Sequence, residues 1–178
     1  MFWRRRLPHW IPADSIVFVT WRLAGTLPQP APSVLIDDTH TLGTFPLQDR
    51  SLDCAMKGPR WLENPVIAAL FVEALLHGEK VRGSYDLFAW AVMPNHVHIV
   101  LKPHEKLPEV VRWMKTASAA RANRLTGRTG QPFWQREYFD TWMRSSQELA
   151  SVIFALRAED WPWSSASKYT GGETAGVF

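Results

Sequence analysis

The stretch Tyr85-Asp-Leu-Phe-Ala-Trp-Ala-Val-Met-Pro-Asn-His-Val-His-Ile-Val-Leu-Lys102 decides the fold of this chain. Its centre, Met93-Pro94-Asn95, is a turn signal between two segments rich in β-branched and aromatic residues, which predicts an antiparallel hairpin. From His96 onward polar and apolar residues alternate, as expected of a half-buried strand. Because successive side chains on a strand point to opposite faces, His96 and His98 should lie on the same face. Two imidazoles so placed can bind one divalent cation.

Further elements surround this hairpin, and each carries a local signal. Asn64 before Pro65 is a helix start, and Gly78 is the expected end of that helix. Ser145 and Glu148 form a capping box. The predicted elements are a strand at 15–24, a helix at 65–76, strands at 85–92 and 96–102, a helix at 108–125 with a stripe of Val111, Met114, Ser118, Ala122 and Leu125, a strand at 137–144, and a last helix with Leu149, Val152, Ile153 and Leu156 on one side.

This order predicts an α+β fold: a ferredoxin-like β-α-β-β-α-β antiparallel sheet with helices on one face, plus an added C-terminal helix. The third strand, which carries the histidines, is central in that topology. The 178 residues, 46% of them hydrophobic and 21% charged, fit one domain spanning 1–178. Within it we expect a basic N-terminal arm at 1–13, an irregular insertion at 25–62 with a short helix near 52–57, and a C-terminal tail at 159–178.

Charge and cysteine content limit the partners and the compartment. The formal net charge is +3 and the pI is about 9.2, so polyanions are plausible partners, although a solvated surface explains the same excess. Cys54 is the single cysteine, so no disulfide can form within the chain, and a reducing cytoplasm is expected. No apolar run is long enough for a signal peptide or a membrane span.

Four segments together resemble one known family. They are Phe18-Val-Thr-Trp-Arg-Leu23, Trp90-Ala-Val-Met-Pro-Asn-His-Val-His98, Phe133-Trp-Gln-Arg-Glu-Tyr-Phe-Asp140 and Asp160-Trp-Pro-Trp-Ser-Ser165. A His-x-His pair alone also occurs as ordinary strand residues or as a zinc pair. With its surroundings, the pair resembles that of the REP-associated tyrosine transposases, which are single-tyrosine HUH transposases related to small insertion-sequence transposases.

The resemblance implies cleavage and joining of single-stranded DNA in transposition. In that chemistry His96 and His98 hold Mg²⁺ or Mn²⁺, which polarises the scissile phosphate, and a tyrosine attacks to form a covalent 5′-phosphotyrosine. Phosphate oxygens, water and usually one further side chain complete the metal's coordination. The implied partner is single-stranded or hairpin DNA, and the family also suggests a homodimer. No membrane partner is expected.

The sequence departs from the family where the nucleophile should lie, because the last helix reads Val152-Ile-Phe-Ala-Leu-Arg157 and contains no tyrosine. Counting from Arg144 and Glu148 puts Ala155 at the nucleophile's place, so we interpret the tyrosine segment, together with a further metal ligand, as deleted. Tyr138 is a weak candidate for a substitute, and Tyr85 and Tyr169 are no better. Whether the chain is an enzyme therefore stays open at this point.

Several residues are candidates for binding DNA. The basic arm of Arg4, Arg5 and Arg6 is suited to phosphates. Ten Trp and nine Phe exceed what a core of this size needs, so some are candidates for base stacking, although Trp21 and Trp90 on strands are expected to be core. The remaining candidates for DNA contacts are Asn95, Arg112, Lys115 and Arg136.

Three hypotheses follow. The first is a transposase-family protein that binds single-stranded or hairpin DNA and keeps the metal pair, with cleavage impaired for want of a nucleophile. The second is a non-catalytic nucleic-acid-binding regulator derived from such an enzyme. The third is an inactive remnant, which should fold poorly.

Overall fold

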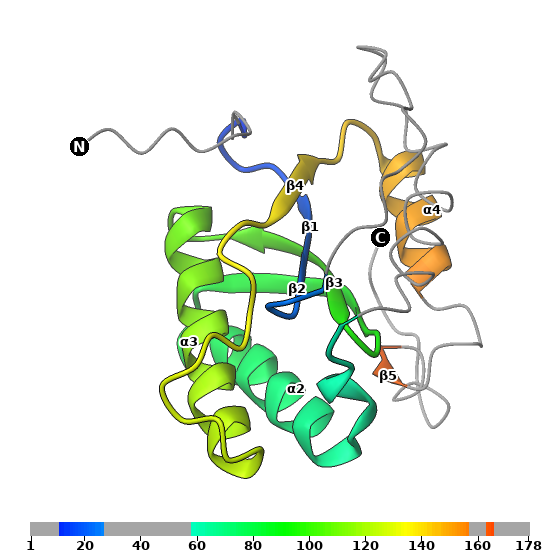
Figure 1. The fold of residues 1–178 in the computed structure, drawn as a ribbon. Helices are drawn as coiled ribbons and strands as arrows, with labels where there is room; N and C mark the ends of the chain where they lie inside the picture. Colours follow the sequence, from blue (N-terminus) through cyan, green and yellow to red (C-terminus); the bar gives the residue numbers. More distant parts are fainter. Residues whose placement is uncertain (1–10, 27–57, 157–162, 166–178) are drawn as a thin grey trace.

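A computed structural model describes residues 11–26, 58–156 and 163–165. Within these residues the chain forms a five-stranded antiparallel sheet with strand order β4-β1-β3-β2-β5, and helices lie on both of its faces (Figure 1). The elements, in chain order, are β1 (Val17–Arg22), the short 3₁₀ helix η2 (Trp61–Glu63), α2 (Pro65–Lys80), β2 (Tyr85–Val92), β3 (His96–Pro103), α3 (Leu107–Leu125), β4 (Phe139–Trp142), α4 (Ser146–Leu156) and β5 (Trp163–Ser164).

The ferredoxin-like prediction is confirmed. β1, α2, β2, β3, α3 and β4 follow one another as predicted, and β3 lies in the centre of the sheet. The hairpin turn between β2 and β3 is closed by the bond from the Met93 amide to the His96 carbonyl, at 2.9 Å. The resulting register sets Val92 opposite Val97 and Ala91 opposite His98. The tight turn therefore fixes which face of β3 each histidine occupies.

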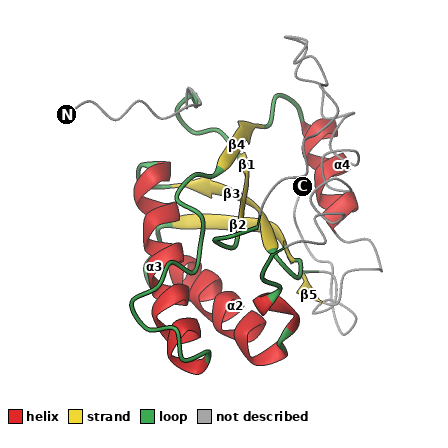
Figure 2. Ribbon diagram, in the orientation of Figure 1, coloured by secondary structure: helices red, strands yellow, loops and turns green. Residues whose placement is uncertain are grey.

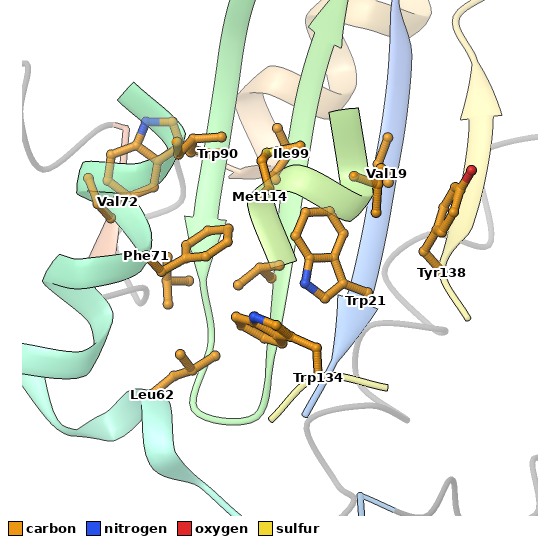
Figure 3. Close-up of a cluster of buried hydrophobic side chains, with 14 of the residues drawn as sticks. Val19, Trp21, Leu62, Phe71, Val72, Trp90, Ile99, Met114, Trp134 and Tyr138 are labelled. Carbon is orange, nitrogen blue, oxygen red and sulfur yellow. The ribbon is translucent and has the colours of Figure 1, made fainter. Parts of the chain in front are cut away.

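Helices α2 and α3 lie side by side on one face of the sheet, and α4 lies apart from them (Figures 1 and 2). The α2–α3 face covers the main core, where Trp21, Phe71 and Trp134 meet edge to face (Figure 3). A smaller cluster fills the other face, under α4. Its buried members are Phe18, Ala89, Ala91, Val100, Met143, Val152 and Leu156.

Local capping explains where two helices begin. The Asn64 side chain accepts a hydrogen bond from the Val66 amide at 2.9 Å, and Pro65 occupies the first turn, as predicted. At α4 the Ser145 hydroxyl accepts from the Glu148 amide at 3.1 Å, while the Glu148 carboxylate accepts from the Arg144 amide at 2.5 Å. The first bond is the one that the capping box predicts, whereas the second reaches the amide one residue before the N-cap Ser145.

The structure corrects three sequence predictions. Helix α2 does not end before Gly78 but continues to Lys80. Gly78 lies inside the helix at a point of close packing, where a Cβ would overlap the Tyr85 hydroxyl and lie 2.8 Å from Trp113. Leu125 is 59% exposed and does not belong to the buried stripe of α3. The predicted tail contains an edge strand, β5, which pairs with β2.

The remaining predictions about segments fall largely outside the described residues. This holds for the basic arm and for the helix near 52–57. Of the insertion at 25–62, only its two ends are described, and the 3₁₀ helix η2 lies at the second of them. None of the helices in the described ranges combines the length and apolar character that crossing a membrane requires.

Candidate functional site

The two histidines of β3 converge on one point. Their rings lie on the same face of the strand, as the alternation predicts, with Nε2 of His96 3.0 Å from Nε2 of His98. The ring planes are 80° apart and the centroids are separated by 4.6 Å. Both side chains therefore present the same nitrogen to the same place, on the most central strand of the sheet.

Asn95 orients the first of these rings. Its Oδ1 lies 2.6 Å from Nδ1 of His96, and its backbone carbonyl accepts a hydrogen bond from the Leu23 amide at 2.8 Å. If Nδ1 carries the proton and donates it to Asn95, Nε2 keeps a free lone pair. The sequence suggested that Asn95 contacts DNA, whereas in the structure its side chain is buried and bonded to His96.

The histidines are buried, which corrects the prediction of a half-buried strand. Each is 1% exposed, and every residue from His96 to Leu101 is buried. His98 stacks on Phe18 of β1, with ring centroids 5.5 Å apart and planes inclined by 23°. Phe18 in turn belongs to the cluster under α4. The sequence pattern indicated the face of each residue but not the elements that cover that face.

The pair fits two positions of a metal site. Two ligands in adjacent positions of an octahedron, each about 2.1 Å from the ion, stand about 3.0 Å apart. The Nε2–Nε2 separation of 3.0 Å matches this value. Within the described ranges, no group of three or more His, Cys, Asp or Glu side chains is placed to hold a metal ion. Without a metal, the same separation suits a hydrogen bond between the two rings.

Arg22, which sequence reasoning missed as a site residue, lies beside the pair. The register of β1 and β3 sets Arg22 opposite His96 and Thr20 opposite His98. Cross-strand partners share a face, so the Arg22 side chain stands on the histidine face of the sheet. Its Nε donates a hydrogen bond to Oε1 of Gln135 at 3.1 Å. The available signal was the alternation of β1, which puts Thr20 and Arg22 on the face opposite Val19 and Trp21.

The segment that contains this hairpin matches a known family. Residues 66–152 match the family described as "Transposase IS200 like", a range that begins in α2 and ends in α4. This part of the chain is similar to the IS200-like transposases. No curated protein matches the chain by sequence.

Two solved structures resemble this chain. One is a REP-associated tyrosine transposase bound to a REP hairpin, with 13% identity, a TM-score of 0.58, and coverage of 93% of this chain and 84% of that one. At this identity the likeness shows a shared fold. The other is a putative transposase from Deinococcus radiodurans R1, with 17% identity, a TM-score of 0.41, and coverage of 87% and 95%.

Both tyrosines of the described ranges lie on the face of the sheet away from the histidines. Tyr138 is buried in the main core on the α2–α3 side, with Nζ of Lys115 5.5 Å from its ring (Figure 3). Tyr85 belongs to the same core and donates its hydroxyl proton to the Leu75 carbonyl at 2.5 Å. Burial raises the pKa of Tyr85 far above its usual value. The structure thus separates Tyr138 from the histidine pair, and Tyr169 lies outside the described residues.

Ala155 belongs to the helix on the histidine side of the sheet. Helix α4 packs Val152 and Leu156 onto the cluster that contains Phe18, with Leu149 and Ile153 beside them, as the sequence predicts. Ala155 itself is partly buried. The assignment of Ala155 to the nucleophile's place in the family stays a prediction.

Apart from Asn95, the predicted DNA-binding residues are not gathered around the histidines. Arg112 is exposed on α3, the helix that covers the opposite face, and Arg136 is exposed just before β4. Lys115 is used within the fold, since its Nζ donates to the carbonyls of residues 135, 136 and 137 at 2.9, 3.3 and 3.1 Å. Trp134, a candidate for base stacking, is buried in the main core. Arg4, Arg5 and Arg6 lie outside the described residues.

Proposed function

We propose that this protein binds single-stranded or hairpin DNA and holds a divalent metal ion, Mg²⁺ or Mn²⁺, between His96 and His98, in the manner of a transposase whose DNA cleavage is impaired. The observation that carries the proposal is the convergence of the two Nε2 atoms at 3.0 Å inside a segment similar to the IS200-like transposases. The solved structure that shares the fold is bound to a REP hairpin, which supports a DNA hairpin as the ligand.

The chain's own residues have defined tasks in this proposal. Asn95 holds the ring of His96 so that its Nε2 lone pair points at the shared position. His98 is held by stacking on Phe18. When bound, the metal would polarise a phosphate of the DNA and favour attack on phosphorus. Because two side chains would fill only two positions, phosphate oxygens and water would have to supply the others.

Impaired cleavage is supported by where the two described tyrosines lie. A nucleophile has to reach a phosphate held at the histidines, yet Tyr85 and Tyr138 are buried on the other face of the sheet. Ala155, on the histidine side, has no nucleophilic group. The family match also ends at Val152, before this position. Without a tyrosine hydroxyl the covalent phosphotyrosine cannot form at that place.

Restoring the missing residue tests the proposal. The full chain and its Ala155→Tyr variant would be incubated with Mn²⁺ and a pool of end-labelled hairpin oligonucleotides with randomised loops and single-stranded flanks. We expect both proteins to shift the pool in a native gel, and only Ala155→Tyr to form an adduct that survives denaturation. The double variant Ala155→Tyr/His96→Ala should bind without forming the adduct.

Other outcomes point to the alternatives. An adduct formed by the unaltered chain and lost in Tyr138→Phe would refute impaired cleavage and identify Tyr138 as the nucleophile. If neither protein forms an adduct and His96→Ala leaves DNA affinity unchanged, the non-catalytic regulator is the better description. A chain that binds no member of the pool would refute the DNA-binding proposal, and absence of a cooperative thermal transition would support the inactive remnant.

A further inference from the structure

Arg22 ends β1 next to the histidine pair, on the same face of the sheet. The side chain is partly buried, and burial lowers the pKa of its guanidinium, which nevertheless stays charged at neutral pH. The strand residues that flank it on this face are Thr20, His96 and His98. None of these neighbours is acidic, and among the described residues no carboxylate forms an ion pair with Arg22.

The guanidinium is held in place through Gln135. Besides accepting from Nε of Arg22, Gln135 donates its side-chain amide to the Thr26 carbonyl at 3.1 Å. Its backbone amide donates to the Arg22 carbonyl at 2.8 Å, and its own carbonyl accepts from Lys115. These contacts fix Gln135 on both sides, so the orientation of the Arg22 head group is set before any ligand arrives.

One end of the guanidinium lacks an acceptor. Nη1 of Arg22 is buried and has no hydrogen-bond partner among the described residues. An unpaired buried donor is costly, and on a charged group the cost is greater than on a neutral one. Such groups are rare in folded proteins and call for an explanation such as a bound ion. An anionic acceptor would satisfy the N–H groups of Nη1 and would balance a charge that no described carboxylate pairs with.

We propose that Arg22 is a phosphate-binding residue, which uses the part of its guanidinium not held by Gln135 to bind a backbone phosphate of single-stranded DNA beside His96 and His98. The planar guanidinium suits the tetrahedral oxygens of phosphate and can donate two parallel hydrogen bonds. This inference rests on the proposed function for its ligand, while the anion site itself stands on the geometry of Arg22 and Gln135.

Two measurements on the full chain test the site, with Arg22→Gln as the main variant. The first is the affinity for a fluorescein-labelled (dT)20 strand at several NaCl concentrations. On a single strand, every phosphate that the protein neutralises adds about 0.7 to the salt slope. We expect Arg22→Gln to raise Kd by about tenfold and to reduce the slope by about this amount. The second is Tm in sodium phosphate against sodium chloride at equal ionic strength, where phosphate should stabilise the unaltered chain but not Arg22→Gln.

Two further variants serve as controls. Arg124→Gln removes an exposed arginine from α3, on the other side of the sheet, and should change neither measurement. Arg22→Lys keeps the charge but not the planar fork, so it should weaken (dT)20 binding several-fold with little change in slope. If Arg22→Gln fails to fold, Arg22→Lys decides the matter, and binding equal to that of the unaltered chain overturns the proposal.

The two measurements, of (dT)20 affinity and of Tm in phosphate, distinguish failure of this proposal from failure of the proposed function. If the unaltered chain does not bind (dT)20 but phosphate stabilises it and fails to stabilise Arg22→Gln, the anion site stands and the single-stranded DNA ligand is wrong. If Arg22→Gln keeps both the salt slope and the phosphate effect, the anion site is wrong and DNA binding stands. Absence of both DNA binding and phosphate stabilisation in the unaltered chain overturns both proposals.

Discussion

The two faces of the sheet are built from the same strands but differ in composition and, in our proposal, in role. The face under α2 and α3 holds large apolar side chains that interlock, such as Trp21 with Phe71 and Trp134. The face under α4 holds a smaller apolar cluster beside four polar residues of β1 and β3, which are Thr20, Arg22, His96 and His98. The two histidines are the most buried of the four. Because neighbours along a strand alternate between faces, one strand can contribute to stability with one residue and to chemistry with the next.

The largest effect on stability is expected from a comparison of two neighbouring residues on β1, one on each face of the sheet. Trp21→Ala removes a buried indole from the main core, and we expect the free energy of unfolding to fall by about 3–5 kcal/mol. Thr20→Val, on the other face, removes only the hydrogen bond to the Val97 carbonyl and should cost about 1 kcal/mol. Urea denaturation would measure both. Equal losses would contradict the view that stability is concentrated under α2 and α3.

A second test concerns how tightly the α2–α3 side is packed. A Cβ on Gly78 would overlap the Tyr85 hydroxyl and lie 2.7 Å from its Cζ and 2.8 Å from Cζ3 of Trp113. Gly78→Ala should therefore lower the free energy of unfolding by about 1–3 kcal/mol, although alanine is the better helix former. The matched control is Ala69→Gly, also within α2 and only partly buried, where removing the methyl should cost about 1 kcal/mol. A stabilised Gly78→Ala variant would show that this packing is loose.

The elements set by local signals were the ones that the sequence predicted. The Asn64–Pro65 start, the capping box at Ser145 and the turn at Pro94 each involve residues a few positions apart, and the structure contains all three. The common face of His96 and His98 is equally local, since it depends only on alternation along one strand. This is why the fold and the histidine pair could be inferred without coordinates.

What the sequence could not supply are relations between distant residues. Arg22 and Gln135 are 113 positions apart, and the sequence around neither residue indicates that their side chains form a hydrogen bond. The pairing of β5 with β2 brings residues close to the C-terminus back to the edge of the sheet. A strand of two residues is too short to show the alternation of polar and apolar residues by which strands are predicted. The face on which Tyr138 lies likewise had no functional meaning until the sheet showed which face carries the histidines.

A third test separates function from stability on the histidine face. His98→Gln keeps a polar side chain of similar size but removes one of the two converging Nε2 atoms. Mn²⁺ affinity, followed by electron paramagnetic resonance, should fall by at least about tenfold, while the free energy of unfolding should change by about 1 kcal/mol. His104→Ala, at an exposed histidine beyond the end of β3, should leave Mn²⁺ affinity unchanged. Unaltered Mn²⁺ binding in His98→Gln would refute the metal pair.

The smallest effect is expected at His104, which contrasts with the buried pair because it is exposed and has an acidic partner. Its Nε2 lies 3.0 Å from the Asp86 carboxylate, and its Nδ1 is 2.8 Å from the Gly83 carbonyl. The hydrogen bond to Asp86 raises the pKa of His104, with a further contribution from Gly83. A raised folded-state pKa stabilises the protein fully below the unfolded value of about 6.5, and this contribution disappears as pH rises through the folded pKa.

Since both groups are exposed, the contribution of this pair should be small at any pH. Asp86→Asn should therefore lower Tm slightly at pH 5.5 and hardly at pH 8.5. In a chain that already carries His104→Ala, the same Asp86→Asn substitution should have no pH-dependent effect, because the titrating partner is gone. Thermal denaturation of the four proteins at the two pH values would measure this coupling. A Tm difference that grows with pH would mean that the pair acts on stability with the opposite sign.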